Sequence, residues 1–257
     1  MRMDLWITIS GLFVGMLVGA TGMGGGIIMT PLLLFVFGVP PAVAIGTDLI
    51  FASATKTVGS LQHWRQKTLD FKLLLRVALG SIPGTLAGLF LIYLLKENEA
   101  TLNMFVTKSI SVVFILISIV MLLQLYAKKK TTAVKGSSEL KISVLMAIGF
   151  LTGFLVAITS VGSGTLFMAL LLWIYPWQAS TLVGTDLLHG VLITGLAGLA
   201  HTYLGTIDYV LVLQLLAGSI PGVLIGSKIT VKLPDLYIRI VLITMMMITS
   251  FILLFFR

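Results

Sequence analysis

Long runs free of charged residues alternate with short charged segments along the whole chain. No Asp, Glu, Lys, Arg or His occurs from Leu5 to Thr47, or from Ile142 to Thr185. Shorter runs of the same kind cover residues 77–95, 109–127, 209–227 and 240–256. Each is close to the ~20 residues that cross a bilayer as an α-helix, and the runs lack the polar face of a soluble helix. The pattern therefore predicts an all-α polytopic membrane protein.

A glycine-rich stretch and the motifs after it occur twice, at a constant separation of 138 residues (186 − 48, for example). The first copy has its glycine-rich stretch at 21–26, Gly-Thr-Asp at 46–48 and Gly-Ser-Ile-Pro-Gly at 80–84. The second has the corresponding features at 159–164, 184–186 and 218–222. Residues 11–88 and 149–226 are identical at 27 of 78 positions, many of them Gly, Pro, Asp or His. We interpret the chain as a duplication, with homologous halves at residues 1–127 and 142–257 joined by a basic cytoplasmic linker, residues 128–141.

Each half is predicted to contain four hydrophobic segments, about eight in total. The opening segments, 5–37 and 142–175, are too long for one membrane helix and too short for two. Breaks at Gly22–Gly26 and Ser160–Gly164 divide them. Three helices follow in each half, near residues 41–64, 72–95 and 102–127, and near residues 179–202, 209–231 and 236–256.

The distribution of Lys and Arg predicts how the segments are oriented in the membrane. Connections 63–76 and 128–141 are basic and are expected in the cytoplasm, whereas 96–100 is net acidic and is expected outside. In the second half the basic residues Lys228, Lys232 and Arg239 lie at the position that matches 96–100. This reversal favours an inverted repeat in which each opening segment is a re-entrant hairpin. The competing interpretation makes each opening segment a full crossing and the repeat parallel.

The two breaks are the predicted binding site for a small anion. Backbone that leaves helical geometry inside a membrane must be covered by protein or line a polar cavity. Matching breaks in two halves indicate a transporter's site, and the free N–H groups of a resuming helix attract an anion. Alternatively, the small residues only allow close helix packing. The predicted substrate-binding residues of the breaks are Thr21, Gly22, Gly24, Gly25, Gly26, Thr159, Ser160, Gly162, Ser163 and Gly164.

A few ionisable residues inside the predicted helices are further candidates. Lys56 lies well inside a span, where it would complement an anion, although it could instead extend to the interface or pair with Asp48. Asp48 and Asp186 follow Gly-Thr and are predicted either to cap helix starts or to carry a coupled proton. His189 is a candidate pH-sensitive group. Pro83 and Pro221 interrupt helix hydrogen bonding and are predicted hinges.

Composition narrows the function classes. The chain is 58% hydrophobic and 10% charged, and its net charge of +8 comes from Lys and Arg between apolar runs, which does not favour nucleic-acid binding. Zero Cys excludes disulfides and thiolate metal sites. No phosphate-binding Gly-Lys-Thr/Ser motif and no hydrolase motif occurs in the sequence. We therefore expect no enzyme activity, no metal and no cofactor.

Both glycine-rich openings, both Gly-Thr-Asp elements and both Gly-Ser-Ile-Pro-Gly elements together resemble the sulfite exporter TauE/SafE family. The similarity covers nearly the whole chain. It implies an inner-membrane protein of about eight hydrophobic segments that exports sulfite or an organosulfonate such as sulfoacetate. The second copy has Ser160 and Ser163 where the first has Gly22 and Gly25, so its contribution to a site is expected to differ.

The sequence thus predicts a secondary transporter that exports a small sulfur-containing anion across the bacterial inner membrane by alternating access. An anion channel or an anion importer is one alternative, and a non-transport subunit of a membrane redox complex is another. The expected partners are the anion, protons, the lipid bilayer and a second copy of the chain in a homodimer.

Overall fold

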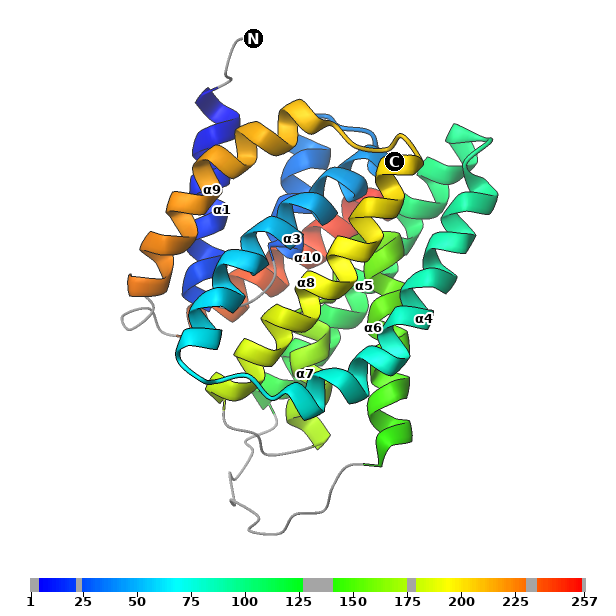
Figure 1. Ribbon diagram of the computed structural model, residues 1–257. Coiled ribbons are helices and arrows are strands. Elements are labelled where there is room, and N and C mark those ends of the chain that lie inside the picture. The colour runs from blue at the N-terminus through cyan, green and yellow to red at the C-terminus, as the bar shows by residue number, and fades with distance from the viewer. Residues whose placement is uncertain (1–4, 22–24, 127–140, 175–178, 230–234, 256–257) are drawn as a thin grey trace.

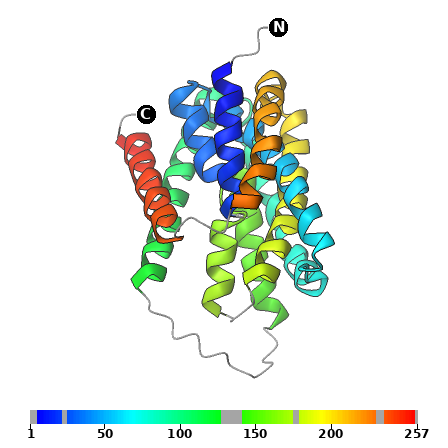
Figure 2. The same ribbon diagram turned by 90° about the vertical axis from the view of Figure 1, so that its left-hand side faces the viewer.

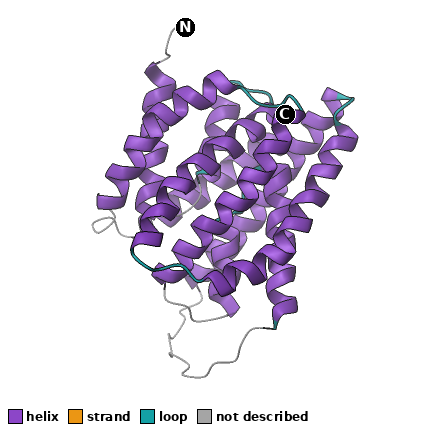
Figure 3. Ribbon diagram, in the orientation of Figure 1, coloured by secondary structure: helices purple, strands orange, loops and turns teal. Residues whose placement is uncertain are grey.

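The computed structural model describes residues 5–21, 25–126, 141–174, 179–229 and 235–255, and all its regular elements there are helical (Figures 1 and 3). Two predicted site residues, Gly22 and Gly24, lie outside the described residues. So does the basic linker, except for Lys141. The elements are α1 Leu5–Thr21, α2 Gly26–Pro31, the π-helix η1 Leu32–Val36, α3 Pro41–Arg65, α4 Phe71–Leu95, α5 Glu99–Tyr126, α6 Ile142–Thr159, α7 Thr165–Ile174, α8 Ala179–Tyr203, α9 Tyr209–Ile229 and α10 Asp235–Phe255.

The predicted all-α membrane class is confirmed. Within the described residues, five helices are long and apolar enough to cross a membrane: Phe71–Leu95, Glu99–Leu125, Ile142–Thr159, Thr181–Tyr203 and Tyr209–Gly226. Shorter apolar helices cover Leu5–Gly19, Gly26–Val36 and Leu242–Phe255. Helix α3 has 25 residues but is not in the first group, and it carries buried Thr47, Asp48, Thr55 and Lys56. These polar side chains of α3 therefore lie inside the protein and do not face lipid.

Both opening segments are broken where the glycines predict it. Helix α1 ends at Thr21, and the chain resumes helical geometry at Gly26. In the second half α6 ends at Thr159, and α7 begins at Thr165. Ser160 has a φ of 60°, and Gly162 and Gly164 have φ of 115° and 140°. Glycine adopts such angles without the steric cost that a side chain brings, which explains why Gly162 and Gly164 stand here.

The broken segments turn back within the molecule. In Figures 1 and 2 the chain descends along α1 and rises again through α2 and η1 before α3 descends. In the second half α6 rises, α7 descends and α8 rises (Figure 1). The second break therefore lies at the turning point of its segment and is buried, and Gly25 and Gly26, where the first segment resumes, are buried as well.

The helices of each half pack mainly against helices of the other half. Helix α1 packs along α9, α4 along α6, α3 on α8 and α5 on α10. These crossings are close because glycines face backbone. A methyl group at Gly80 would overlap the carbonyl oxygen of Met146, and one at Gly218 would overlap that of Thr8. The Gly-Ser-Ile-Pro-Gly elements therefore serve as packing surfaces between the halves.

The central pair, α3 and α8, runs antiparallel. Gly59 lies against Leu187, near the end of α3 and the start of α8. Ile50, earlier in α3, lies against Gly198, later in α8. Because α3 and α8 occupy equivalent positions of the two copies, a helix and its own equivalent point in opposite directions at the centre of the molecule.

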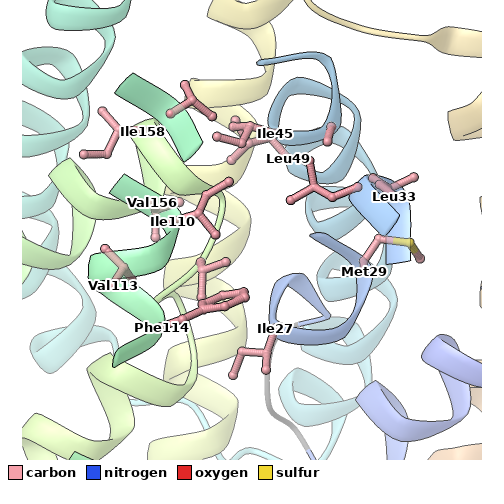
Figure 4. Packing of buried hydrophobic residues seen from close by; sticks show 14 of the residues in the cluster. Ile27, Met29, Leu33, Ile45, Leu49, Ile110, Val113, Phe114, Val156 and Ile158 are labelled. Carbon is pink, nitrogen blue, oxygen red and sulfur yellow. The ribbon is translucent and has the colours of Figure 1, made fainter. Parts of the chain in front are cut away.

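One hydrophobic core spans both halves and surrounds the first break. Figure 4 shows Ile27 and Met29 of α2 and Ile45 and Leu49 of α3 near Phe114 of α5. Val156 and Ile158, at the end of α6, belong to the same cluster. Van der Waals packing of these side chains favours association of the halves, because inside a bilayer the lipid tails are as apolar as the side chains and burial alone gives little driving force.

Helices α4 and α9 pass through Pro83 and Pro221 without a break in their assigned helical range. Pro83 is flanked by Gly80 and Gly84, both of which pack against the backbone of α6. A hinge at either proline stays a prediction.

The threonine of each Gly-Thr-Asp element forms a hydrogen bond to a loop of the other half. The hydroxyl oxygen of Thr47 accepts a hydrogen bond from the backbone N–H of Asp208 at 3.1 Å. In the equivalent contact Thr185 accepts from the N–H of Asp70 at 3.0 Å. The glycine before each threonine leaves room for a loop carbonyl, of Thr206 at Gly46 and of Thr68 at Gly184. We name these two contacts the threonine latches.

Removing a threonine latch is expected to lower stability modestly. Thr47→Val and Thr185→Val each leave a backbone N–H without its acceptor, which costs about 1 kcal/mol. For a protein of this size that corresponds to about 2–4 °C in the unfolding midpoint, measured by thermal unfolding in detergent. Thr57→Val on the exposed face of α3 is the matched control. Equal midpoints for all three variants would show that the latches add nothing.

Candidate functional site

A buried carboxylate joins the two breaks. The Oδ2 atom of Asp48 accepts hydrogen bonds from Thr30 Oγ1 in α2 and from Ser160 Oγ in the second break, both at 2.8 Å. A methyl group at Gly26 would lie 2.8 Å from the carbonyl oxygen of Ser160. Helix α2, which follows the first break, and Ser160 of the second break therefore meet at the side chain of Asp48, in the interior of the protein.

The prediction that Asp48 and Asp186 cap helix starts is wrong. Helix α3 begins at Pro41 and α8 at Ala179, so each aspartate lies about two turns inside its helix. The first turn of α8 contains no acidic residue. The aspartates that do cap helices are Asp70 and Asp208, which accept from the N–H of Leu73 at 2.9 Å and of Leu211 at 3.0 Å.

Lys56 reaches into the second break from α3. Its side chain is fully buried, and its Nζ donates to the carbonyl oxygen of Ser163 at 2.6 Å and to Ser163 Oγ at 2.7 Å. Gly190 on α8 makes room for the amine, because a methyl group there would overlap Nζ. Lys56 is electrostatically attracted to Asp186 and to Asp48. Its amine therefore does not extend to the membrane interface, which removes that alternative.

Asp186 and His189 complete the polar cluster from α8. Asp186 is fully buried, and neither carboxylate oxygen has a hydrogen-bond partner among the described residues. The Nε2 atom of His189 lies 2.9 Å from Ser81 Oγ in α4, and its ring stacks on Phe167 at 4.7 Å between centroids. His189 is thus held between α4 and α7, close enough to Lys56 for their charges to interact.

The cluster is asymmetric although the halves are homologous. The positions equivalent to Thr30 and Ser160, which serve Asp48, are Met168 and Gly22, so their hydroxyls have no counterparts for Asp186. The position equivalent to Lys56 is Thr194, whose hydroxyl donates to Gly190 within its own helix at 2.7 Å. One aspartate is thus held by hydroxyls and the other faces a buried positive charge.

A small cavity lies at the amine of Lys56. Its volume is about 10 Å³, which is room for about one water molecule and too little for a sulfur oxyanion. Two larger hollows, of about 410 and 630 Å³, are lined mostly by apolar side chains and do not suit an anion. The helices must therefore move apart before the cluster can admit a solute. The cavity is lined by Gly26, Ile27, Ala52, Lys56, Ser160, Val161, Gly162, Ser163 and Thr165.

The structure thus brings together five of the predicted binding residues: Gly26, Lys56, Ser160, Gly162 and Ser163. Three of the remaining predicted residues lie elsewhere in the described structure. Thr159 donates to the carbonyl of Leu155 within α6, and Gly25 packs against apolar side chains that include Phe51. Gly164 contributes its backbone angle and is not among the described residues that line the cavity.

Sequence reasoning missed several residues of the cluster. Thr30, Ser81 and Gly190 were not among the predicted site residues, although each contacts the cluster. Ser81 belongs to a repeated motif, so its position carried a signal. Nothing local distinguishes Thr30 or Gly190, since their roles depend on which helix faces them.

The fold and its buried polar cluster define a multi-pass membrane transporter. The chain belongs to the sulfite exporter TauE/SafE family, whose model matches residues 7–253. It is 39% identical over 231 residues to the probable membrane transporter protein YjnA of Bacillus subtilis, covering 89% of this chain and 91% of that protein.

More distant relatives carry the same description. The chain is 27% identical to the probable membrane transporter protein YunE of Bacillus subtilis, with 92% and 93% of the two chains covered. It is 24% identical to the probable membrane transporter protein MJ0441 of Methanocaldococcus jannaschii, with 92% and 90% covered. No solved structure matches the chain significantly.

Proposed function

We propose that this transporter exports a small sulfur-containing anion, sulfite or an organosulfonate, across the bacterial inner membrane by alternating access. The observation that carries the proposal is the fully buried amine of Lys56, held against the second break. An intramembrane lysine with polar backbone around it marks a solute site, and its charge selects an anion. The description of the family as sulfite exporters supports the choice of anion.

Alternating access is supported by the antiparallel arrangement of α3 and α8. If the chain is an inverted repeat, the two halves can exchange conformations and open the site to each side in turn. The one-water cavity favours a carrier over a channel, because a channel needs a continuous path for its ion. In a carrier the closed site is an expected intermediate between the two open forms.

Binding is tested by thermal unfolding of the detergent-purified protein with sulfite, thiosulfate, methanesulfonate, sulfoacetate, sulfate and chloride at equal ionic strength. A ligand at about 100 times its dissociation constant stabilises the native state by about 2.7 kcal/mol. We expect a selective shift with one or more of the first four anions, and efflux of the same anion from loaded proteoliposomes. Equal shifts for all six anions and no efflux would overturn the proposed substrate class.

A further inference from the structure

We infer that Asp186 carries a proton together with the transported anion, because its carboxylate and the anion compete for the single charge of Lys56. This inference rests on the proposed function. It assigns the coupled ion and distinguishes Asp186 from Asp48, which occupies the equivalent position in the first half.

The contacts of the two aspartates separate their roles. Oδ2 of Asp48 holds two hydroxyls at 2.8 Å, and these bonds tie the breaks together. Both oxygens of Asp186 are buried and have no hydrogen-bond partner among the described residues. An ionised carboxylate in such a place depends on a nearby positive charge, and Lys56 is the cation that attracts it. Asp186 is therefore free to change its charge without breaking a structural contact.

Charge balance then links the proton to the anion. Without solute, Lys56 and ionised Asp186 attract each other inside the membrane, while Asp48 keeps its two hydroxyl partners. An anion that joined them would add one more negative charge to those that already face the one amine, which a low-dielectric site disfavours. A proton on Asp186 offsets that charge and leaves Lys56 to the anion. A proton and an anion thus enter the site as a pair and leave it as a pair.

The other titratable groups around Asp186 are less suited to carry the proton. The Nε2 atom of His189 is held by Ser81 and its Nδ1 has no partner among the described residues, but the ring lies near Lys56, so a proton on it would place two positive charges together. His63 of α3 lies beside Gly184, with its Nδ1 2.8 Å from Thr68 Oγ1. Asp70, in the loop latched to Thr185, caps α4 with its carboxylate.

A consequence is that a monovalent anion moves without net charge. The membrane potential then exerts no force on the complete step, and direction follows the sum of the anion and proton gradients. Anion accumulated in the cytoplasm leaves together with protons, and a sufficiently steep inward proton gradient opposes that export.

The test uses the full chain in proteoliposomes loaded with methanesulfonate or thiosulfate, neither of which binds a proton near neutral pH. An internal pH dye counts protons while anion efflux is measured. We expect about one proton to leave with each anion in the wild type. For methanesulfonate, we also expect no dependence on an imposed potassium diffusion potential. The proton-to-anion ratio of the wild type alone tests whether a proton is transported with the anion.

Two matched variants then assign the proton. Asp186→Asn, which imitates the protonated carboxyl, is expected to carry methanesulfonate with no proton. A potential of about 100 mV should then shift its distribution about 50-fold. Asp48→Asn should keep about one proton per anion even where its rate falls. Proton-free efflux in the wild type, or an unchanged proton ratio in Asp186→Asn, would overturn the inference while leaving the proposed function in place. A wild type that carries neither anion, and also no sulfite, overturns the proposed function itself.

Discussion

We expect Lys56→Met to transport the proposed anion at least about 100-fold more slowly than the wild type. The substitution keeps most of the side chain's volume and removes the only charge among the described residues that line the cavity. Truncating one partner of a buried charged contact costs about 2–5 kcal/mol, and about 2.7 kcal/mol corresponds to a 100-fold change. Initial efflux from proteoliposomes at a solute concentration below saturation measures this loss.

The second half supplies the control for this variant. Thr194 occupies the position equivalent to Lys56, and its hydroxyl bonds only within its own helix in the described contacts. Thr194→Val should therefore transport within about 2-fold of the wild type, because an intrahelical hydroxyl bond contributes little. Gel filtration and thermal unfolding verify that both variants are folded. Full transport by folded Lys56→Met would place the anion away from the second break.

We expect Gly80→Ala to unfold at a markedly lower temperature than the wild type. The added methyl group overlaps the carbonyl oxygen of Met146, so α4 and α6 must separate along their whole contact. Such overpacking costs about 1–3 kcal/mol. Gly218→Ala, which meets Thr8 in the equivalent crossing of α9 and α1, is expected to cost the same. The two crossings are distinct, so the costs should add in the double variant.

A glycine on α3 provides the contrast. A methyl group at Gly59 would meet the flexible end of Leu187 at 3.3 Å, and it would touch no backbone within that distance. Alanine also favours helix over glycine by up to about 1 kcal/mol. Gly59→Ala should be neutral or stabilising by differential scanning fluorimetry. A similar loss in all three alanine variants would mean that glycine content, rather than backbone approach, sets the stability.

The sequence was sufficient to predict those features that appear as a local pattern or as a repeat in the chain. Runs without charge predict the membrane helices, and the repeat at 138 residues predicts that both opening segments break at matching positions. Lys56 could be singled out because a charged side chain inside an apolar span is energetically costly and usually has a functional role. The five predicted residues that line the cavity belong to these two signals.

Features that depend on tertiary pairing could not be predicted in the same way. No pattern near Asp48 indicates that Thr30 and Ser160 will face it, since Thr30 lies in α2 and Ser160 lies in the second break, more than a hundred positions further along the chain. The capping hypothesis relied on local spacing and failed because α3 begins two turns earlier, at Pro41. Likewise, Gly-Ser-Ile-Pro-Gly signals a special backbone, but only the structure assigns its glycines to α6 and α1.

The packing of each half's helices against those of the other half has a consequence for how the duplication arose. The glycine faces of α1 and α4 are covered by α9 and α6, which belong to the other half. A single copy of the unit would leave both faces open, and its Gly-Thr-Asp element would find no loop to hold. If the halves form an inverted repeat, the ancestral unit would have functioned as a pair of identical chains inserted in opposite directions. Divergence after fusion would then account for Lys56 in one half and for Asp186 in the other, whose oxygens have no hydroxyl partner among the described residues.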